Sequence, residues 1–178
     1  MIRLVLACLL GCDLLAAPTP PPLAVPPRPG VPQVSRQVDV ETLRALLEAP
    51  SDHVRVYVFW ASWCAPCIAE FPILKSFAAQ HPDVDVVLVN VDSLAVQSAR
   101  VPGLVSRHGL LQLEHIWLVS SDPNRALKQA VTDWPEAIPT ALVVRPDGVR
   151  QAMHVESVDG ATLASSVRAA RQPRPKQP

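Results

Sequence analysis

One stretch of the chain, residues 54–72, constrains the fold more than any other. It begins with Val54-Arg55-Val56-Tyr57-Val58-Phe59, a run of β-branched and aromatic residues that predicts a buried strand. Shortly after this run come Cys64 and Cys67, and apolar residues with a period near 3.6 predict a helix over residues 66–80 that is kinked at Pro72. Two cysteines in C-x-x-C spacing therefore lie where a strand ends and a helix begins.

The position of Cys64 favours a reactive thiol. Cys64 falls near the N-cap of the expected helix, and Pro66 falls in its first turn, where the missing N–H of proline costs no hydrogen bond. Unpaired backbone N–H groups and the positive end of the helix dipole favour thiolate over thiol, and thiolate is the species that attacks disulfides. Cys67 lies one turn further on the apolar face, so we expect Cys64 to be the nucleophile and Cys67 the resolving thiol.

Two sequence elements carry a resemblance to a known family. The segment Trp63-Cys64-Ala65-Pro66-Cys67 resembles the W-C-x-P-C active site of the thioredoxin superfamily, and the following Glu70-Phe71-Pro72 resembles the C-x-x-C-x-x-E-x-P motif of TlpA/ResA-like thiol–disulfide oxidoreductases. The second element, Ala137-Ile138-Pro139-Thr140, precedes an apolar strand and resembles the cis-proline loop that faces the dithiol in that superfamily. The resemblance covers roughly residues 38–171 and implies a thioredoxin-like α/β fold, a mixed β-sheet flanked by helices. It also implies a redox-active disulfide between the two cysteines.

The resemblance implies roles for further residues. It places Trp63, Pro66, Ile138 and Pro139 at the substrate, with the backbone of Ile138 free to pair with an extended peptide. Glu70 lies three residues after the second cysteine and on the same side of the helix, so its carboxylate can accept a proton from that thiol. The alternative is that this glutamate is a solvated surface residue.

One departure from thioredoxins proper bears on the proton acceptor. They carry a buried aspartate two residues before the first motif tryptophan, and this chain has Val58 there. The departure makes Glu70 the candidate acceptor and argues against a general cytosolic thioredoxin.

The start of the chain predicts export. Residues 1–11 combine one basic residue with an apolar run that is too short for a spanning helix, as in a secretory signal. The run ends in Leu9-Leu10-Gly11-Cys12, which resembles a bacterial lipobox, although Leu10 stands where a small residue is usual. Lipidation of Cys12 would tether the protein, whereas cleavage after Ala17 would release it.

Proline content defines the segments on either side of the expected domain. The chain holds 20 prolines, and they cluster in residues 12–37, which predicts an extended polyproline II linker after the signal. At about 3.1 Å per residue, its densest part would span roughly 45 Å. Residues 172–178 are also proline-rich and are predicted to be a disordered tail, which leaves residues 38–171 as the thioredoxin-like domain.

The cysteine count is consistent with a redox-active cysteine pair in an exported protein. Of four cysteines, Cys8 leaves with the signal and Cys12 takes lipid, so only Cys64 and Cys67 remain in the domain. No structural disulfide then competes with the C-x-x-C pair. The formal net charge is zero, which gives no electrostatic case for binding nucleic acid. We expect no cofactor.

The family resemblance narrows the function without fixing the direction of electron flow. It implies a reductant on the periplasmic side of a bacterial membrane that acts on protein disulfides, for example in apocytochromes c, and is recharged by a membrane thiol transporter. An oxidase or isomerase is the first alternative. A Cu(I) or zinc carrier using Cys64, Cys67 and His154 is the second, although the five histidines show no ligand spacing and we expect no metal site.

The remaining elements follow from periodicity and capping residues. Strands and helices alternate, and an antiparallel hairpin comes late in the chain, an order typical of a mixed-sheet α/β fold. The expected elements are a helix from Asp39 to before Pro50, a strand over 84–91, a helix over 94–107 broken at Pro102-Gly103, a strand over 116–119, a helix from Ser121 or Asp122 to 131, hairpin strands over 140–144 and 149–155, and a helix from Asp159 or Gly160.

Overall fold

The computed structural model describes residues 35–172. The predictions for the signal peptide, Cys12 and most of the proline-rich linker fall outside these residues. The elements in chain order are β1 (Arg36–Val38), α1 (Val40–Glu48), β2 (Val54–Trp60), α2 (Ala65–Ala69), α3 (Phe71–Gln80), β3 (Val84–Asn90), α4 (Leu94–Arg107), β4 (Glu114–Leu118), α5 (Pro123–Ala130), β5 (Thr140–Val144), β6 (Arg150–Val155) and α6 (Gly160–Ala170).

A mixed six-stranded sheet forms the centre of the molecule. Its strand order is β1-β4-β3-β2-β5-β6, in which β1, β4, β3 and β2 run parallel and the β5–β6 hairpin joins antiparallel to β2. The central strands β2 and β3 pair from Val54↔Val84 to Trp60↔Asn90, and every residue of β2 is buried. The continuous apolar run over residues 54–59 is the signature of such a doubly covered strand, and the predicted mixed sheet is confirmed.

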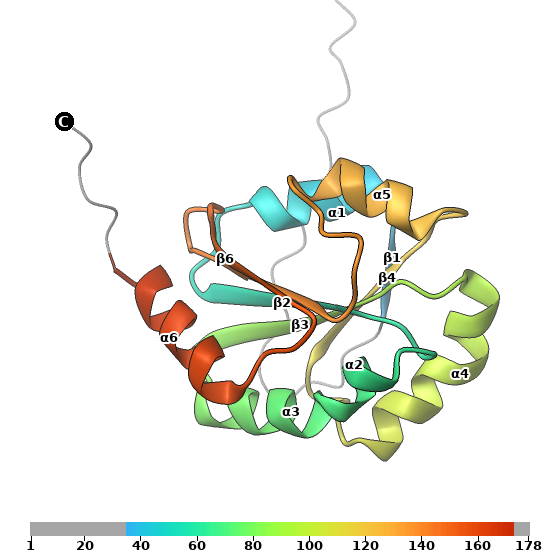
Figure 1. Ribbon diagram of the computed structural model, residues 1–178, viewed down its shortest axis with the longest axis horizontal. Coiled ribbons are helices and arrows are strands. Elements are labelled where there is room, and N and C mark those ends of the chain that lie inside the picture. The colour runs from blue at the N-terminus through green and yellow to red at the C-terminus, as the bar shows by residue number, and fades with distance from the viewer. Residues whose placement is uncertain (1–34, 173–178) are drawn as a thin grey trace, which may run out of the picture.

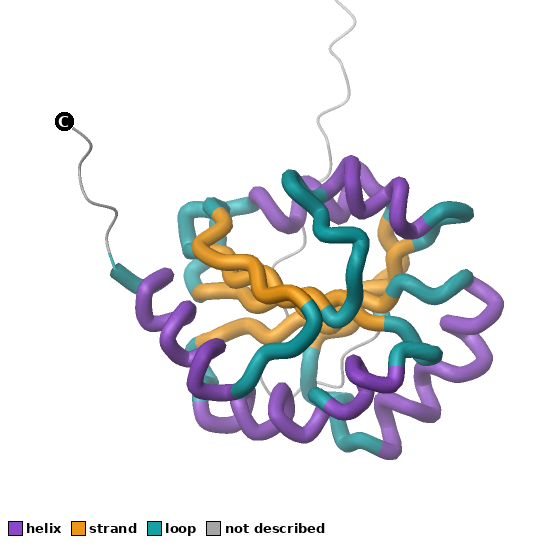
Figure 2. The backbone as a smooth tube through the Cα atoms, viewed as in Figure 1, coloured by secondary structure: helices purple, strands orange, loops and turns teal. Residues whose placement is uncertain are grey.

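Helices cover both faces of this sheet. Helices α1 and α5 lie on one face, and α2, α3, α4 and α6 lie on the other (Figure 1), with the sheet visible between the two layers in Figure 2. The division follows from right-handed crossovers, because the chain moves across the sheet in opposite directions through α1 and through α3 and α4. Trp60 at the end of β2 meets the ring of Phe71 at the start of α3 edge-on, with ring centroids 4.9 Å apart. This contact fixes the end of β2 against the helical layer.

Three helices begin at aspartates that were among the predicted helix starts. The carboxylate of Asp39 accepts a hydrogen bond from the Thr42 backbone N–H at 2.8 Å, and that of Asp122 accepts one from the Arg125 N–H at 3.0 Å. Asp159 does the same for the first turn of α6. Short polar side chains at these positions satisfy helix N–H groups that have no partner within the helix.

The β5–β6 turn needs its glycine. Gly148 has φ +80, in the left-handed region, and a Cβ at this position would collide with the backbone carbonyl of Glu48. The predicted turn over residues 145–148 is therefore confirmed, and it packs against the end of α1.

One strand was not predicted. β1 pairs in parallel with β4, with Arg36 opposite Ile116, and the Arg36 guanidinium lies 3.0 Å from the Glu114 carboxylate. The assignment of residues 36 and 37 to the linker is therefore wrong. A three-residue strand is too short to show periodicity, and only its pairing with β4 defines it.

Two prolines act differently from one another. The helix expected over residues 66–80 is two helices, because Pro72 offers no N–H to continue α2 and instead falls in the first turn of α3. The expected break at Pro102-Gly103 does not occur, and α4 runs through Pro102 as one helix. Pro102 is exposed, so a carbonyl left without its N–H partner there can reach water.

A buried arginine closes the end of α1. The guanidinium of Arg55 on β2 donates to the backbone carbonyls of Leu46 and Ala49 and to the hydroxyl of Tyr57. These bonds satisfy carbonyls that the last turn of α1 leaves free. Burial raises the pKa of the Tyr57 phenol to about 12, so this phenol stays neutral.

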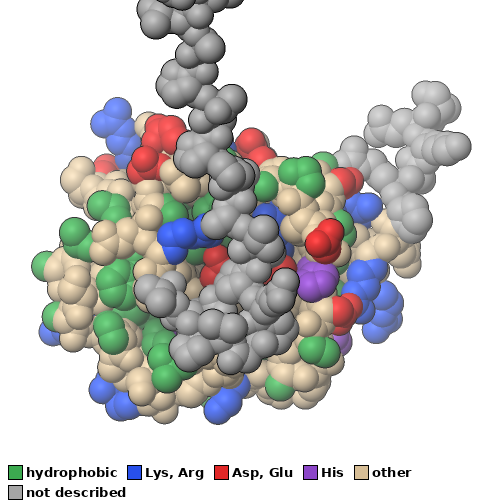
Figure 3. Space-filling view, turned by 180° about the vertical axis from the view of Figure 1, so that it is seen from behind, with side chains coloured by type: hydrophobic (Ala, Val, Ile, Leu, Met, Phe, Trp, Pro, Cys, Tyr) green, Lys and Arg blue, Asp and Glu red, His purple; other side chains and the backbone are tan. Residues whose placement is uncertain are grey.

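The surface shows no dominance of either charge. On the face seen from behind, Lys, Arg, Asp and Glu side chains are interspersed (Figure 3), in line with the zero net charge of the chain. Within residues 35–172, no helix has the length and the apolar character that crossing a bilayer requires.

Candidate active site

The two motif cysteines form a disulfide at the end of β2. Their sulfurs are 2.07 Å apart and their Cα atoms 5.3 Å apart. Cys64 is the N-cap residue of α2, and the backbone N–H of Cys67 points at the Cys64 sulfur over 3.3 Å. Because α2 is only five residues long, this local N–H group matters more for a thiolate than the helix dipole does.

The cis-proline loop faces the disulfide. The Ile138–Pro139 peptide is cis, as predicted, and the carbonyl oxygen of Ile138 lies 3.7 Å from the Cys64 sulfur. The hydroxyl of Thr140 donates to the carbonyl of Ala137 at 2.8 Å and closes the loop. Residues 74 positions apart in the chain thus meet at the sulfur atom.

The other predicted substrate residues lie around the cysteines. Trp63 is 70% exposed beside Cys64, and Pro66 is exposed in the first turn of α2. Both cysteines are buried, with 4% and 2% of their surfaces exposed. In this disulfide state, access to sulfur therefore runs past the indole of Trp63 and the backbone of Ile138.

Glu70 is a buried carboxylate, so the alternative of a solvated surface residue is wrong. It lies at the junction of α2 and α3, is 4% exposed, and accepts a hydrogen bond from the Val158 backbone N–H at 2.9 Å. Burial raises the pKa of Glu70, and hydrogen bonds from the Val158 N–H and the Ser157 side chain oppose that rise.

A short segment between β6 and α6 connects Glu70 to the cis-proline loop. The backbone N–H of Glu156 donates to the carbonyl of Pro139 at 2.9 Å, and two residues later Val158 binds the Glu70 carboxylate. Glu156 adopts φ 74, in the left-handed region. The segment therefore contacts both the buried carboxylate and the loop that faces the disulfide.

Asp92, which sequence reasoning missed, holds the turn before Cys64. It is 3% exposed and accepts hydrogen bonds from the Ser62 backbone N–H at 2.7 Å, the Ser62 hydroxyl at 3.2 Å and the Asn90 side-chain amide at 2.9 Å. Gln97 on α4 in turn donates to the backbone carbonyl of Asn90. A signal was present, because Asp92 follows the carboxyl end of a central parallel strand, where sites in open α/β sheets gather.

The structure also bears on the residues considered for other chemistry. Val58 is 1% exposed between Leu88 and Ala141 of the neighbouring strands, so hydrocarbon occupies the position of the thioredoxin aspartate. His154 lies on β6 with its Nε2 2.9 Å from the Ser166 hydroxyl. Over the described part of the chain, His, Cys, Asp and Glu side chains nowhere gather in threes that could hold a metal ion.

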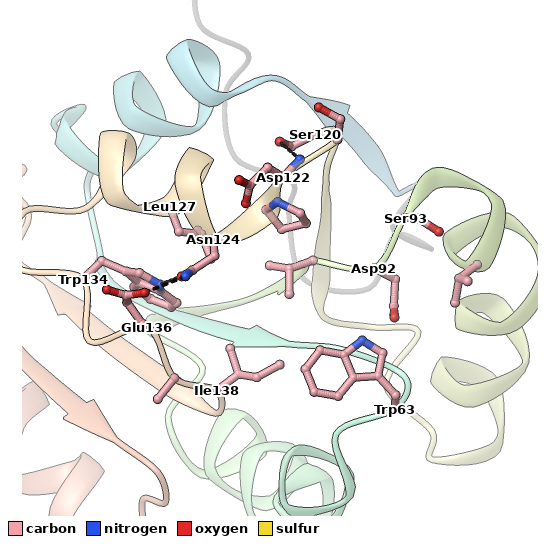
Figure 4. A pocket seen from close by; sticks show the side chains of 15 residues that line it. Trp63, Asp92, Ser93, Ser120, Asp122, Asn124, Leu127, Trp134, Glu136 and Ile138 are labelled. Atoms are coloured by element: carbon pink, nitrogen blue, oxygen red, sulfur yellow. Dashed lines mark hydrogen bonds between the residues drawn. The ribbon is translucent and has the colours of Figure 1, made fainter.

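An open groove of about 680 Å³ adjoins the disulfide. Trp63 and Ile138 line it on the side of the cysteines, and residues from the ends of β3 and β4, from α5 and from the loop before β5 complete it (Figure 4). Within it, the indole N–H of Trp134 donates to Asn124 at 3.0 Å, and the Asn124 amide donates to Glu136 at 2.8 Å. The site thus combines a buried redox-capable pair with an accessible groove.

Known structures share this fold. A thiol:disulfide interchange protein of the thioredoxin family from Chlorobium tepidum superposes with a TM-score of 0.56 at 21% identity, over 83% of this chain and 99% of that one. A thioredoxin-related protein from Neisseria meningitidis serogroup B gives a TM-score of 0.56 at 22% identity, over 70% of this chain and 89% of that one. The predicted thioredoxin-like fold is confirmed.

Curated relatives match over most of the described chain. The thiol-disulfide oxidoreductase ResA of Oceanobacillus iheyensis is 27% identical over 135 residues, which are 72% of this chain and 64% of that protein. The thiol:disulfide interchange protein DsbE homolog of Paracoccus denitrificans is 28% identical over 126 residues, 71% of this chain and 62% of that protein. The chain thus spans less than two thirds of the length of either relative. The model of the Redoxin family matches residues 34–169, from just before β1 into α6, and the chain therefore belongs to that family.

Proposed function

We propose that this chain is a thiol–disulfide oxidoreductase, exported and tethered to a bacterial membrane, that reduces disulfides of exported proteins such as apocytochromes c. The observation that carries the proposal is the Cys64–Cys67 disulfide at the first turn of α2, with the Ile138 carbonyl 3.7 Å from the Cys64 sulfur. Relatives named thiol-disulfide oxidoreductase ResA and thiol:disulfide interchange protein DsbE homolog support the activity class.

The reaction begins from the reduced dithiol. The Cys64 thiolate attacks one sulfur of a target disulfide, a bond forms between them, and the target's other sulfur leaves as a thiolate and takes a proton. Cys67 then loses its proton and attacks the Cys64 sulfur, which closes the Cys64–Cys67 disulfide and releases the target's second sulfur. Two electrons pass from the dithiol to the target, and a membrane thiol transporter returns them.

Glu70 is the residue we assign to the second proton transfer. Its carboxylate is buried and its pKa is raised by that burial, which brings it closer to the working pH of a general base. Glu70 lies three residues after Cys67, and its backbone N–H donates to the Cys67 carbonyl at 3.3 Å. A proton acceptor one helical turn after the resolving thiol would let Cys67 ionise as the mixed disulfide forms.

The substrate is expected to enter along Trp63, Pro66, Ile138 and Pro139. Trp63 and Pro66 are exposed on one side of the cysteines, and the backbone of Ile138 lies on the other. An extended peptide can form main-chain hydrogen bonds to a backbone edge of this kind. Its disulfide would then lie against the Cys64 sulfur.

Export and tethering rest on the first part of the sequence. Residues 1–11 have the character of a signal, Cys12 ends a lipobox-like segment, and prolines in the linker would hold the domain away from the membrane. Metabolic labelling with a fatty acid, compared between the wild-type chain and Cys12→Ala, separates a lipidated protein from one cleaved after Ala17.

A trapping experiment tests the reaction. Cys67→Ser should accumulate mixed disulfides with exported proteins on Cys64, because the resolving thiol is gone, whereas Cys64→Ser should accumulate few. The same exported proteins should become less reduced when the wild-type chain is deleted. If Cys67→Ser captures no partner, or if the reduction potential of the wild-type pair lies near the strongly oxidising value of roughly −120 mV, the reductant proposal fails.

A further inference from the structure

The groove beside the disulfide has a partly apolar lining. The lining includes the apolar residues Val91, Val96, Leu127 and Trp134 together with Trp63, the exposed indole next to Cys64. A volume of about 680 Å³ lies within the usual range of pockets that enclose a ligand. The groove therefore has room for the residues that flank a target cysteine.

Acidic side chains surround this groove. Asp92 from the end of β3, Asp122 at the start of α5 and Glu136 from the loop before β5 all line it (Figure 4). Among the described residues that line it, none is a lysine, an arginine or a histidine. The lining therefore carries three formal negative charges and no positive one.

A lysine that pairs with one of these acidic residues only partly offsets this charge. The Lys128 ammonium lies 2.5 Å from one oxygen of Glu136, but both side chains are about half exposed, so water and salt screen the pair. Asp122 uses one carboxylate oxygen to cap α5 through the Arg125 N–H, which leaves its charge in place.

We infer that the groove selects substrate segments that carry a lysine or arginine within a few residues of the target cysteine. The inference rests on the proposed function and adds the local sequence that the enzyme prefers. A cationic side chain in the groove gains from Asp122 and Glu136 and can lie over the Trp63 indole. An acidic side chain in the same place is repelled by all three carboxylates.

Three disulfide-linked peptides of equal length test the inference. They differ at one position, two residues from the cysteine, which is Lys, Gln or Glu. Stopped-flow rates of their reduction by the reduced full-length chain should follow the order Lys, Gln, Glu, with roughly a fivefold difference between the extremes at low salt. High salt should shrink this difference, because the groove is open to solvent.

Charge-removing variants identify the source of the selectivity. Asp122→Asn keeps the helix cap, since asparagine caps about as well as aspartate, and Glu136→Gln keeps an oxygen for the Asn124 amide. The double variant should lower the Lys-to-Glu rate ratio at least twofold. Asp39→Asn is the matched control, because Asp39 caps α1 through the same i+3 contact and lies outside the groove lining; it should leave the ratio unchanged.

The outcomes separate this inference from the proposed function. Equal rates for the three peptides, or a ratio that survives in the double variant, would overturn the charge selectivity while leaving the oxidoreductase activity intact. Failure to reduce any peptide would overturn the proposed function and, with it, this inference. A falling ratio in Asp39→Asn would show that charge outside the groove, and not the charge of the groove, sets the selectivity.

Discussion

Two buried carboxylates flank the cysteine turn, and the protein holds them in contrasting ways. Asp92, at the end of β3, accepts three hydrogen bonds, two from Ser62 and one from Asn90. Glu70, between α2 and α3, accepts one from the Val158 backbone and one from the Ser157 side chain. Both residues are almost fully excluded from solvent, at 3% and 4% exposed. The two carboxylates are therefore equally buried but differ in the number of hydrogen bonds that they accept.

The number of donors around each carboxylate separates the two roles. Each donated hydrogen bond favours the ionised form, while burial disfavours it. For Glu70 the balance leaves the pKa raised, as expected for a group that exchanges a proton. Asp92 is tied to the backbone two residues before Cys64, as expected for a group that fixes the geometry of the turn. We expect mutations of the two residues to diverge in stability and in activity.

The largest effect should come from Asp92→Ala. The substitution leaves the Ser62 N–H, the Ser62 hydroxyl and the Asn90 amide without their acceptor, which should lower the free energy of unfolding by about 3 kcal/mol. Urea unfolding of the oxidised full-length chain measures this. Asp83→Ala is the control, because the Asp83–Arg171 ion pair is exposed and its loss should have little effect. A loss from Asp92→Ala no larger than that of the control would remove Asp92 as the support of the turn.

Glu70→Gln, unlike Asp92→Ala, should slow the reaction without lowering stability. Glutamine still offers an oxygen to the Val158 N–H and carries no buried charge, so the free energy of unfolding at neutral pH should not fall. Release of product from the mixed disulfide should slow at least about tenfold, because Cys67 loses its proton acceptor. Rapid-quench kinetics of that step give the rate, and Glu48→Gln at the end of α1 is the matched control. An unchanged rate would exclude Glu70 from the mechanism.

The smallest effect should appear in the pH dependence of stability. The pKa of Glu70 in the folded chain is raised above its ordinary value of 4.5, which applies to the unfolded chain. Between these two pKa values, the folded chain binds the Glu70 proton more tightly than the unfolded chain does. The stability that this group contributes is therefore highest at pH values below 4.5 and is lost as the pH rises through the folded pKa. Urea unfolding across the acidic to neutral range should show this fall.

The difference between wild type and Glu70→Gln isolates this contribution. Burial also raises the pKa of Glu114, although its pairing with Arg36 opposes that rise, so the wild-type curve alone mixes two groups. Subtracting the Glu70→Gln curve from the wild-type curve should cancel the Glu114 part and leave only the Glu70 part. A difference that stays flat, or that rises with pH, would contradict a raised pKa for Glu70.

Much of the fold could be predicted from the sequence because the signals are local. The apolar run of β2, the caps Asp39, Asp122 and Asp159 and the turn at Gly148 each depend on neighbours within a few residues. The family motifs also gave the cysteine pair and the cis peptide before Pro139. Local rules predicted a kink at Pro72, close to where α2 gives way to α3, but they misjudged the exposed Pro102, which lies within one continuous helix.

The sequence by itself determined a thiol pair at the start of a helix and a proline loop to face it. Only the tertiary structure decided their surroundings. Val158 reaches Glu70 across 88 residues and Asp92 reaches Ser62 across 30, while β1 exists only because β4 lies beside it. Burial, donor number and the charge of a groove are properties of segments that meet in space, and the strand order of the sheet sets which segments meet.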